Sequence, residues 1–285
     1  MLQKYNNPFC SEKPSNCIFR LAEYKQEKVF HHEKTEEHTL IFCQKGGMRI
    51  TSNLFAEEVL CEGEVIFLPR MNSYGGTVLC DTVLLIHEFN NTVCHPEQCI
   101  LAYLYTYKRS QESSSFYHCK LVACESLITF LNTTILYIRD GQSDPSVWII
   151  KHMELIWIFT HYYSNKELYS FFYPIMDEQI PFKSLVLAHY RKANKSKELA
   201  SLCGYGIYTF HRTFKKEFGI SVHQWLIKKR AENIKYRLSQ TFISLTDIMD
   251  EFNFSSPQHF SHFCKKHLGD TPKSLRQKLT NSDKQ

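Results

Sequence analysis

Polar and basic side chains recur at matching positions in two segments in the last third of the chain. They are, in order, Tyr208, Thr209, His211, Arg212 and Lys215, then Ser256, Gln258, His259, His262 and Lys265. Such hydroxyl, amide, imidazole, guanidinium and ammonium groups exchange hydrogen bonds with polar partners and pair with anions. Phenylalanines interleaved at three- and four-residue spacing predict that each segment is a helix with one buried face. Each segment therefore offers an exposed helix face suited to base edges and phosphates.

Each of these segments follows a shorter amphipathic segment and a turn residue. The short segments have apolar residues three to four apart: Leu199 with Leu202, and Ile248 with Phe252. Gly204 and Asn253 follow them, and these two residue types enter the left-handed region at least cost. The pattern predicts a helix-turn-helix in each copy. Because any two short amphipathic helices can imitate one copy, the duplication is the stronger signal.

The two copies together resemble the DNA-binding domain of AraC/XylS-type transcription regulators. The matching residues are Leu199-Ala200, Gly204-Tyr205, Phe214-Lys215-Lys216, Gly219, Arg230-Ala231, Phe254-Ser255, His259-Phe260, Phe263, Gly269 and Thr271-Pro272. The resemblance covers residues 183–277. It implies two recognition helices that enter adjacent major-groove segments on one face of the duplex and bend or strain it. A linker helix at residues 223–238 would join them.

The second copy departs from the family pattern. The departures are Met249, Asn253, His262 and Cys264. The buried filler of its second helix is either Phe263 or Cys264. We expect the second helix to read DNA more weakly than the first, so that Arg212 and Tyr208 make more of the specific contacts. Two hydrogen bonds from arginine to guanine are worth roughly 1–3 kcal/mol of discrimination.

Charge is segregated in the same way. Residues 183–285 hold 19 Lys and Arg against 8 Asp and Glu, whereas residues 1–182 hold 15 against 21. The net charges are therefore +11 and −6, within a total of +5. A basic end on an otherwise acidic chain is typical of a phosphate-binding module attached to a part that does not bind nucleic acid.

The first ninety residues predict short strands separated by turns. Apolar runs at residues 40–43, 48–51, 65–68 and 83–86 are bounded by Gly-Gly pairs and a proline. Such strands indicate a small barrel or sandwich. Residues 62–69 resemble a Gly-Asp turn and strand of the cupin-like domain in many AraC-type regulators, with Glu64 in the acidic position. That resemblance implies a small-molecule effector inside the barrel, although no lining residue can be assigned.

Metal chemistry and catalysis find little support in this region. A metal-binding cupin needs a His-x-His pair, because alternate residues of a strand share a face. Here His31 and His32 are adjacent, with Glu37 and His38 nearby. We assign no catalytic residue, metal ligand or cofactor. A metal-dependent cupin enzyme and a nonspecific architectural DNA-binding protein are kept as alternatives.

Two strong helices are expected after the strands, at residues 121–140 and 145–163, with a turn at residues 141–143. Asp144-Pro145 is an N-cap followed by proline at the first helical position. Aromatic residues, including Trp148 and Trp157, surround the second helix. In the family such helices often pair two subunits, so a homodimer is expected. The alternative is that the helices only cover the barrel.

Eleven cysteines are scattered without a zinc-type spacing. We interpret them as reduced, mostly buried thiols. A redox sensor that uses Cys94 with Cys99, or Cys119 with Cys124, is the alternative.

These observations predict an α+β protein with three parts. A cupin-like β domain occupies residues 1–120, a helical segment residues 121–180, and an AraC-type DNA-binding domain residues 181–285, opened by a helix at residues 183–193. We expect a sequence-specific transcription regulator that activates genes, with promoter DNA and RNA polymerase as partners. With no signal peptide or spanning segment expected, the protein is placed in the cytoplasm without a membrane partner.

Overall fold

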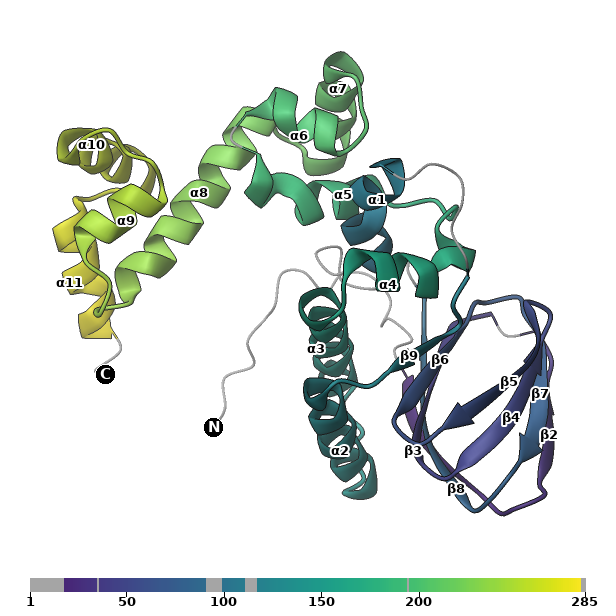
Figure 1. The fold of residues 1–285 in the computed structure, drawn as a ribbon. Helices are drawn as coiled ribbons and strands as arrows, with labels where there is room; N and C mark the ends of the chain where they lie inside the picture. The colour runs from purple at the N-terminus through teal and green to yellow at the C-terminus, as the bar shows by residue number, and fades with distance from the viewer. Residues whose placement is uncertain (1–17, 35, 91–98, 111–116, 194, 283–285) are drawn as a thin grey trace. The chain divides into compact units, whose positions relative to one another are not determined.

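The computed structural model describes residues 18–34, 36–90, 99–110, 117–193 and 195–282 (Figure 1). The chain divides into two compact units, Met1–Arg191 and Lys192–Gln285. The first unit contains antiparallel sheets followed by helices, and the described part of the second is helical. The fold is therefore α+β, as the sequence predicts.

Two antiparallel sheets form the β part of the first unit. The order in the five-stranded sheet is β1 (Ile18–Tyr24), β8 (Thr82–Phe89), β3 (His38–Lys45), β6 (Glu64–Leu68), β9 (Lys120–Val122). The order in the four-stranded sheet is β2 (Val29–His32), β7 (Tyr74–Val78), β4 (Gly47–Ser52), β5 (Phe55–Cys61). All four predicted apolar runs lie in these strands. The predicted small barrel or sandwich of short strands is thus confirmed.

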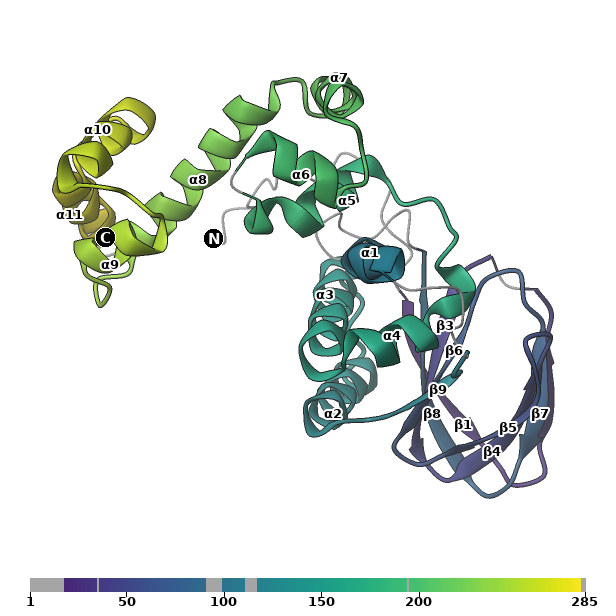
Figure 2. The same cartoon turned by 45° about the horizontal axis from the view of Figure 1, so that its top comes forward.

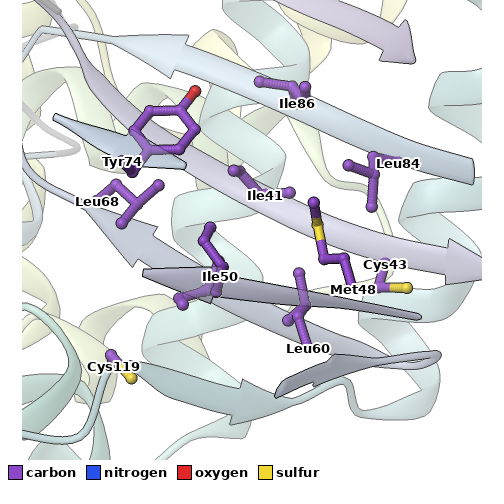
Figure 3. Close-up of a cluster of buried hydrophobic side chains, with 11 residues drawn as sticks. Ile41, Cys43, Met48, Ile50, Leu60, Leu68, Tyr74, Leu84, Ile86 and Cys119 are labelled. Carbon is purple, nitrogen blue, oxygen red and sulfur yellow. The ribbon is translucent and has the colours of Figure 1, made fainter. Parts of the chain in front are cut away.

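The core between the sheets follows from the two-residue period of a strand (Figure 3). Ile41 and Cys43 come from one sheet and Met48 and Ile50 from the other, and none is more than 2% exposed. Strand β3 is buried on its other face as well, so its sequence is a continuous apolar run rather than an alternating one. Strand β4 alternates more because part of its outer face meets solvent.

Glu64, the acidic residue of the predicted cupin-like turn, has a structural role. Gly63 has a φ of +79° between β5 and β6, which glycine adopts at least cost. The Glu64 carboxylate accepts a hydrogen bond from the Cys61 backbone N–H at 2.8 Å. Glu64 therefore stabilises the turn that joins the two sheets.

Helices α1 (Ile100–Ser110), α2 (Glu125–Arg139), α3 (Pro145–Tyr162) and α4 (Asn165–Phe171) follow the main strands. Asp144 caps α3 by accepting from the Ser146 N–H at 2.9 Å, as predicted. Lys151 of α3 donates to the Thr133 hydroxyl of α2 at 2.9 Å. Since both residues are similarly far from the turn, the helices form an antiparallel pair.

The predicted start of α2 at residue 121 is wrong. Leu121 lies in β9 and pairs with Val65 of β6, whereas α2 begins at Glu125. The apolar residues at 121 and 122 fit a strand as well as a helix. The partner that selects the strand lies more than fifty residues earlier in the chain, where local periodicity gives no information.

A buried histidine pair joins the five-stranded sheet to α3. His87 Nε2 of β8 lies 2.8 Å from His152 Nδ1, and His87 Nδ1 lies 3.1 Å from the Ile18 carbonyl oxygen. Because a carbonyl only accepts, His87 donates through Nδ1, and His152 then donates to His87 Nε2. Burial lowers the pKa of both rings, that of His152 to about 4. The pair is therefore neutral at pH 7.

Helix α5 (Phe182–His189) and the 3-10 turns η2 (Tyr173–Ile175) and η3 (Tyr190–Lys192) complete the chain up to the second unit. The helix predicted at residues 183–193 therefore ends at His189. It contacts α1 of the same unit, and its residues Leu185 and Val186 are buried. No described helix is both long and apolar enough to cross a membrane.

The second unit contains α6 (Ser196–Leu202), α7 (Ile207–Phe218), α8 (Val222–Ser239), α9 (Leu245–Glu251), α10 (Pro257–Leu268) and α11 (Pro272–Ser282). Helices α6 and α7 lie at one end of α8, and α9, α10 and α11 lie at the other (Figure 2). Within this unit, α8 is the predicted linker helix.

Candidate nucleic-acid interface

Both copies of the motif have the same turn geometry. Gly204 has a φ of +76° and Asn253 one of +52°, so each reverses the chain in the left-handed region. The same backbone hydrogen bond closes each turn at 2.9 Å: Tyr205 N to Ala200 O, and Phe254 N to Met249 O. The departure at Asn253 therefore preserves the turn.

Helix α7 separates its buried and exposed faces as predicted. Phe210 and Phe214 are fully buried. The residues expected to contact DNA are all exposed: Tyr208, Thr209, His211, Arg212 and Lys215. Tyr208 is 90% exposed, which is unusual for a large aromatic side chain. This face presents donors, acceptors and two positive charges to solvent.

Helix α10 presents a similar face with a smaller buried filler. Phe260 and Cys264 are buried, and Phe263 is only half-buried, so Cys264 takes the core position that the sequence left open. The exposed residues of the predicted set are Gln258, His259, His262 and Lys265.

Ser256 differs from the other predicted contacts. It is the N-cap of α10, and its hydroxyl oxygen accepts from the His259 backbone N–H at 3.2 Å. It therefore precedes the exposed helix face rather than lying on it. Its hydroxyl hydrogen is still able to donate to a phosphate.

Helix α8 packs against the two copies through opposite faces. Val222 and Trp225 are buried near its start, whereas Ala231, Ile234 and Leu238 are buried in its second half. Trp225 and Ile234 are nine residues apart, which is about two and a half turns of an α-helix. Their side chains therefore leave opposite sides of α8, and one continuous helix belongs to both hydrophobic cores.

Two side chains of α8 reach the recognition helices themselves. The Trp225 ring lies 5.7 Å from the Phe214 ring and 5.4 Å from the Phe218 ring of α7. The Arg230 guanidinium lies 5.4 Å from the Phe263 ring of α10. The sequence pattern includes Arg230 but assigns it no function, and it does not include Trp225. The one local feature of the sequence that could have indicated these contacts is the presence of large aromatic or planar side chains within a linker helix.

Among the histidines near the start of the barrel, His38 has hydrogen-bond and ion-pair partners within the protein. His38 is buried; its Nδ1 accepts from the Arg70 N–H at 3.1 Å, and its Nε2 lies 3.4 Å from the Glu178 carboxylate. His31 is exposed and His32 half-buried, so they point to opposite faces of β2. Among the described residues, no group of three His, Cys, Asp or Glu side chains could hold a metal ion.

The cysteines of the described ranges are all free thiols. Cys119 is buried and Cys124 half-buried, and burial raises the pKa of Cys119 to about 12. A thiol with such a pKa is a poor nucleophile. Cys94, the partner proposed for Cys99, lies outside the described residues.

Comparison with known proteins agrees with this geometry. Residues 199–278 match a family model described as a helix-turn-helix domain. The chain is 25% identical over 137 residues to the HTH-type transcriptional regulator ExsA of Pseudomonas aeruginosa, covering 48% of this chain and 49% of ExsA. It is 29% identical over 91 residues to the transcriptional activator RhaS of Yersinia pestis, covering 32% of this chain and 33% of RhaS.

The chain thus spans between a third and a half of these relatives' lengths. A solved structure of an apo ToxT variant from Vibrio cholerae aligns with a TM-score of 0.41 and 11% identity, over 94% of this chain and 100% of that one. This structural likeness is too weak to support an inference.

Two helix-turn-helix motifs on one shared helix define a DNA-binding domain of the class found in transcription regulators. Residues 199–278 therefore hold a helix-turn-helix domain of the AraC type, similar to the corresponding parts of these two regulators.

Proposed function

We propose that this regulator binds promoter DNA sequence-specifically, with α7 and α10 in adjacent major-groove segments, and that it activates transcription. The observation that carries the proposal is the pair of recognition helices, each with phenylalanine-anchored packing on one side and exposed polar side chains on the other. Because a relative named as an activator matches the same region, contact with RNA polymerase is part of the proposal.

Within this proposal α7 makes the stronger base contacts. Arg212 and Tyr208 are exposed on α7, and arginine reads guanine with two hydrogen bonds. Helix α10 offers Gln258 and two histidines, with Lys265 toward its end. These side chains make weaker contacts with bases than those of α7. We therefore expect more of the affinity of α10 to come from contacts with phosphates.

Selection of DNA from a random duplex library tests the proposal. We expect the chain to enrich a defined sequence. Arg212→Ala should weaken binding to that sequence by roughly 1–3 kcal/mol, which is about 5- to 150-fold. Arg139→Ala is the matched control, since Arg139 is exposed on α2 of the first unit. Enrichment of no sequence, with equal affinity for every fragment, would instead indicate an architectural DNA-binding protein.

A homodimer is also proposed, through the α2–α3 pair. Ile150 and Trp157 of α3 are 62% and 49% exposed, and their seven-residue spacing places them on one helix face. Leu136 of α2 is 56% exposed. Trp157→Glu should shift the sedimentation of the chain toward the monomer. Val29→Glu, which changes a residue 68% exposed on β2, is the control.

The interior of the β part restricts the kind of small-molecule effector that could bind there. The side chains between the two sheets are apolar and buried (Figure 3). This packing counts against a polar effector in that place, because an inserted polar group would lack hydrogen-bond partners. An effector taken up between the sheets would be an apolar molecule.

A further inference from the structure

Arg230 of α8 contacts three successive parts of the second helix-turn-helix. Its Nη2 donates to the carbonyl oxygen of Phe252, the C-cap residue that follows α9. Its guanidinium carbon lies 4.4 Å from the centre of the Phe254 ring, in the turn. The same carbon lies 5.4 Å from the centre of the Phe263 ring, on α10. One side chain thus connects the linker helix to the first helix, the turn and the recognition helix.

This combination of contacts requires an arginine. The planar guanidinium stacks on aromatic faces and donates in its own plane at the same time. Lysine would keep the charge but has no planar group to stack. Methionine would fill the space but could not donate to the Phe252 carbonyl. Arg230 therefore constrains both the distance and the rotation of α10 relative to α8.

The first copy is tied to the same helix by different chemistry. Trp225 contacts the rings of Phe214 and Phe218, which both belong to α7. These contacts are between aromatic rings. The orientation of α7 relative to α10 therefore depends on how both helices are attached to α8, and Arg230 adds a directional hydrogen bond to the attachment of the second copy.

The small filler of α10 increases the importance of Arg230. Cys264 occupies the core position, and Phe263 lies half-buried beside it. A cysteine side chain offers fewer packing contacts than a phenylalanine, so it restrains the rotation of α10 less. Phe263 is the residue of α10 that Arg230 contacts.

We propose that Arg230 is a positioning residue that sets the spacing this protein accepts between its two DNA half-sites. The inference depends on the proposed function, since it requires both recognition helices to bind one duplex. Helix-turn-helix half-sites on one face of DNA are about 10 base pairs apart. An inserted base pair rotates and shifts one half-site, so a rigid protein must lose contacts there, whereas a loosened one can adjust.

The test uses the full chain and the DNA sequence that the wild type selects from a random duplex library. Binding is measured to that sequence and to versions with one or two base pairs inserted between the half-sites. For Arg230→Met and Arg230→Lys we expect the penalty for an insertion to shrink by about tenfold, or ~1.4 kcal/mol. Lys235→Met is the matched control, because it removes an exposed charge from α8.

The outcomes separate the two proposals. If the wild type selects no sequence, the proposed function fails. If it selects a site with one spacing and both Arg230 variants keep the full penalty, only the assignment of Arg230 is overturned. If Arg230→Lys alone keeps the wild-type spacing preference, then the positive charge rather than planar stacking sets the spacing. That result would also overturn the assignment. Binding to DNA that carries only the second half-site verifies that the second copy is folded in each variant, and the lysine variant decides the question if the methionine variant unfolds.

Discussion

Acidification should loosen α3 from the sheet through His152. In the folded protein His152 is 3% exposed, and burial lowers its pKa to about 4. In the unfolded chain an ordinary histidine has a pKa of about 6.5. The folded state therefore binds this proton less readily than the unfolded state. Stability is full above pH 6.5 and falls as the pH drops toward 4.

The size of the effect follows from the two pKa values. His152 alone should cost about 2 kcal/mol of stability at pH 5 and about 3 kcal/mol at pH 4. His87 acts in the same direction, since burial and the neighbouring His152 lower its pKa well below its usual value. Phe19, stacked on His87 with ring centres 3.9 Å apart, offers no compensating charge.

Hydrogen exchange of peptides from α3, corrected for the intrinsic effect of pH, measures this. His152→Gln keeps an N–H donor for His87 but does not titrate. As the pH is lowered, we expect the free energy of opening to decrease more steeply in the wild type than in His152→Gln. His161→Gln, at an exposed position of the same helix, should behave like the wild type. Equal pH slopes in the wild type and His152→Gln would refute the reasoning and assign the acid sensitivity to other groups.

Two further substitutions test backbone requirements. Asn253→Ala should lower stability by about 1 kcal/mol in thermal unfolding, because a residue at a φ of +52° gains strain when the side chain cannot bond locally. Asn253→Gly should not, and equal losses in both would contradict this explanation. Gly76→Ala should prevent folding of the first unit as judged by circular dichroism, since a Cβ there would clash with the Arg49 carbonyl oxygen. A folded Gly76→Ala protein would show that β4 and β7 can separate.

Local signals explain which parts were predictable. The turns at Gly204 and Asn253 and the cap at Asp144 involve residues close together in the chain, and each appears in the structure as the sequence indicates. The exposed residues of α7 and α10 also follow from helical spacing. Their contacts with DNA are still a prediction.

Other features depended on partners distant in the chain. Leu121 was predicted in a helix, but Val65 pairs with it in a sheet. The periodicity of α10 allowed either Phe263 or Cys264 inside, and only packing against α8 and α11 selected Cys264.

The sequence alone determined that the chain has two helix-turn-helix units, because capping, turn formation and amphipathic spacing act over a few residues. Tertiary structure decided how the two helix-turn-helix motifs are attached to each other through α8. It also decided which contacts hold α3 to the five-stranded sheet. Arg230 meets Phe263, and His87 meets His152, only after distant segments have packed. Such contacts arise from the summed packing of the whole unit, which no short window of sequence contains.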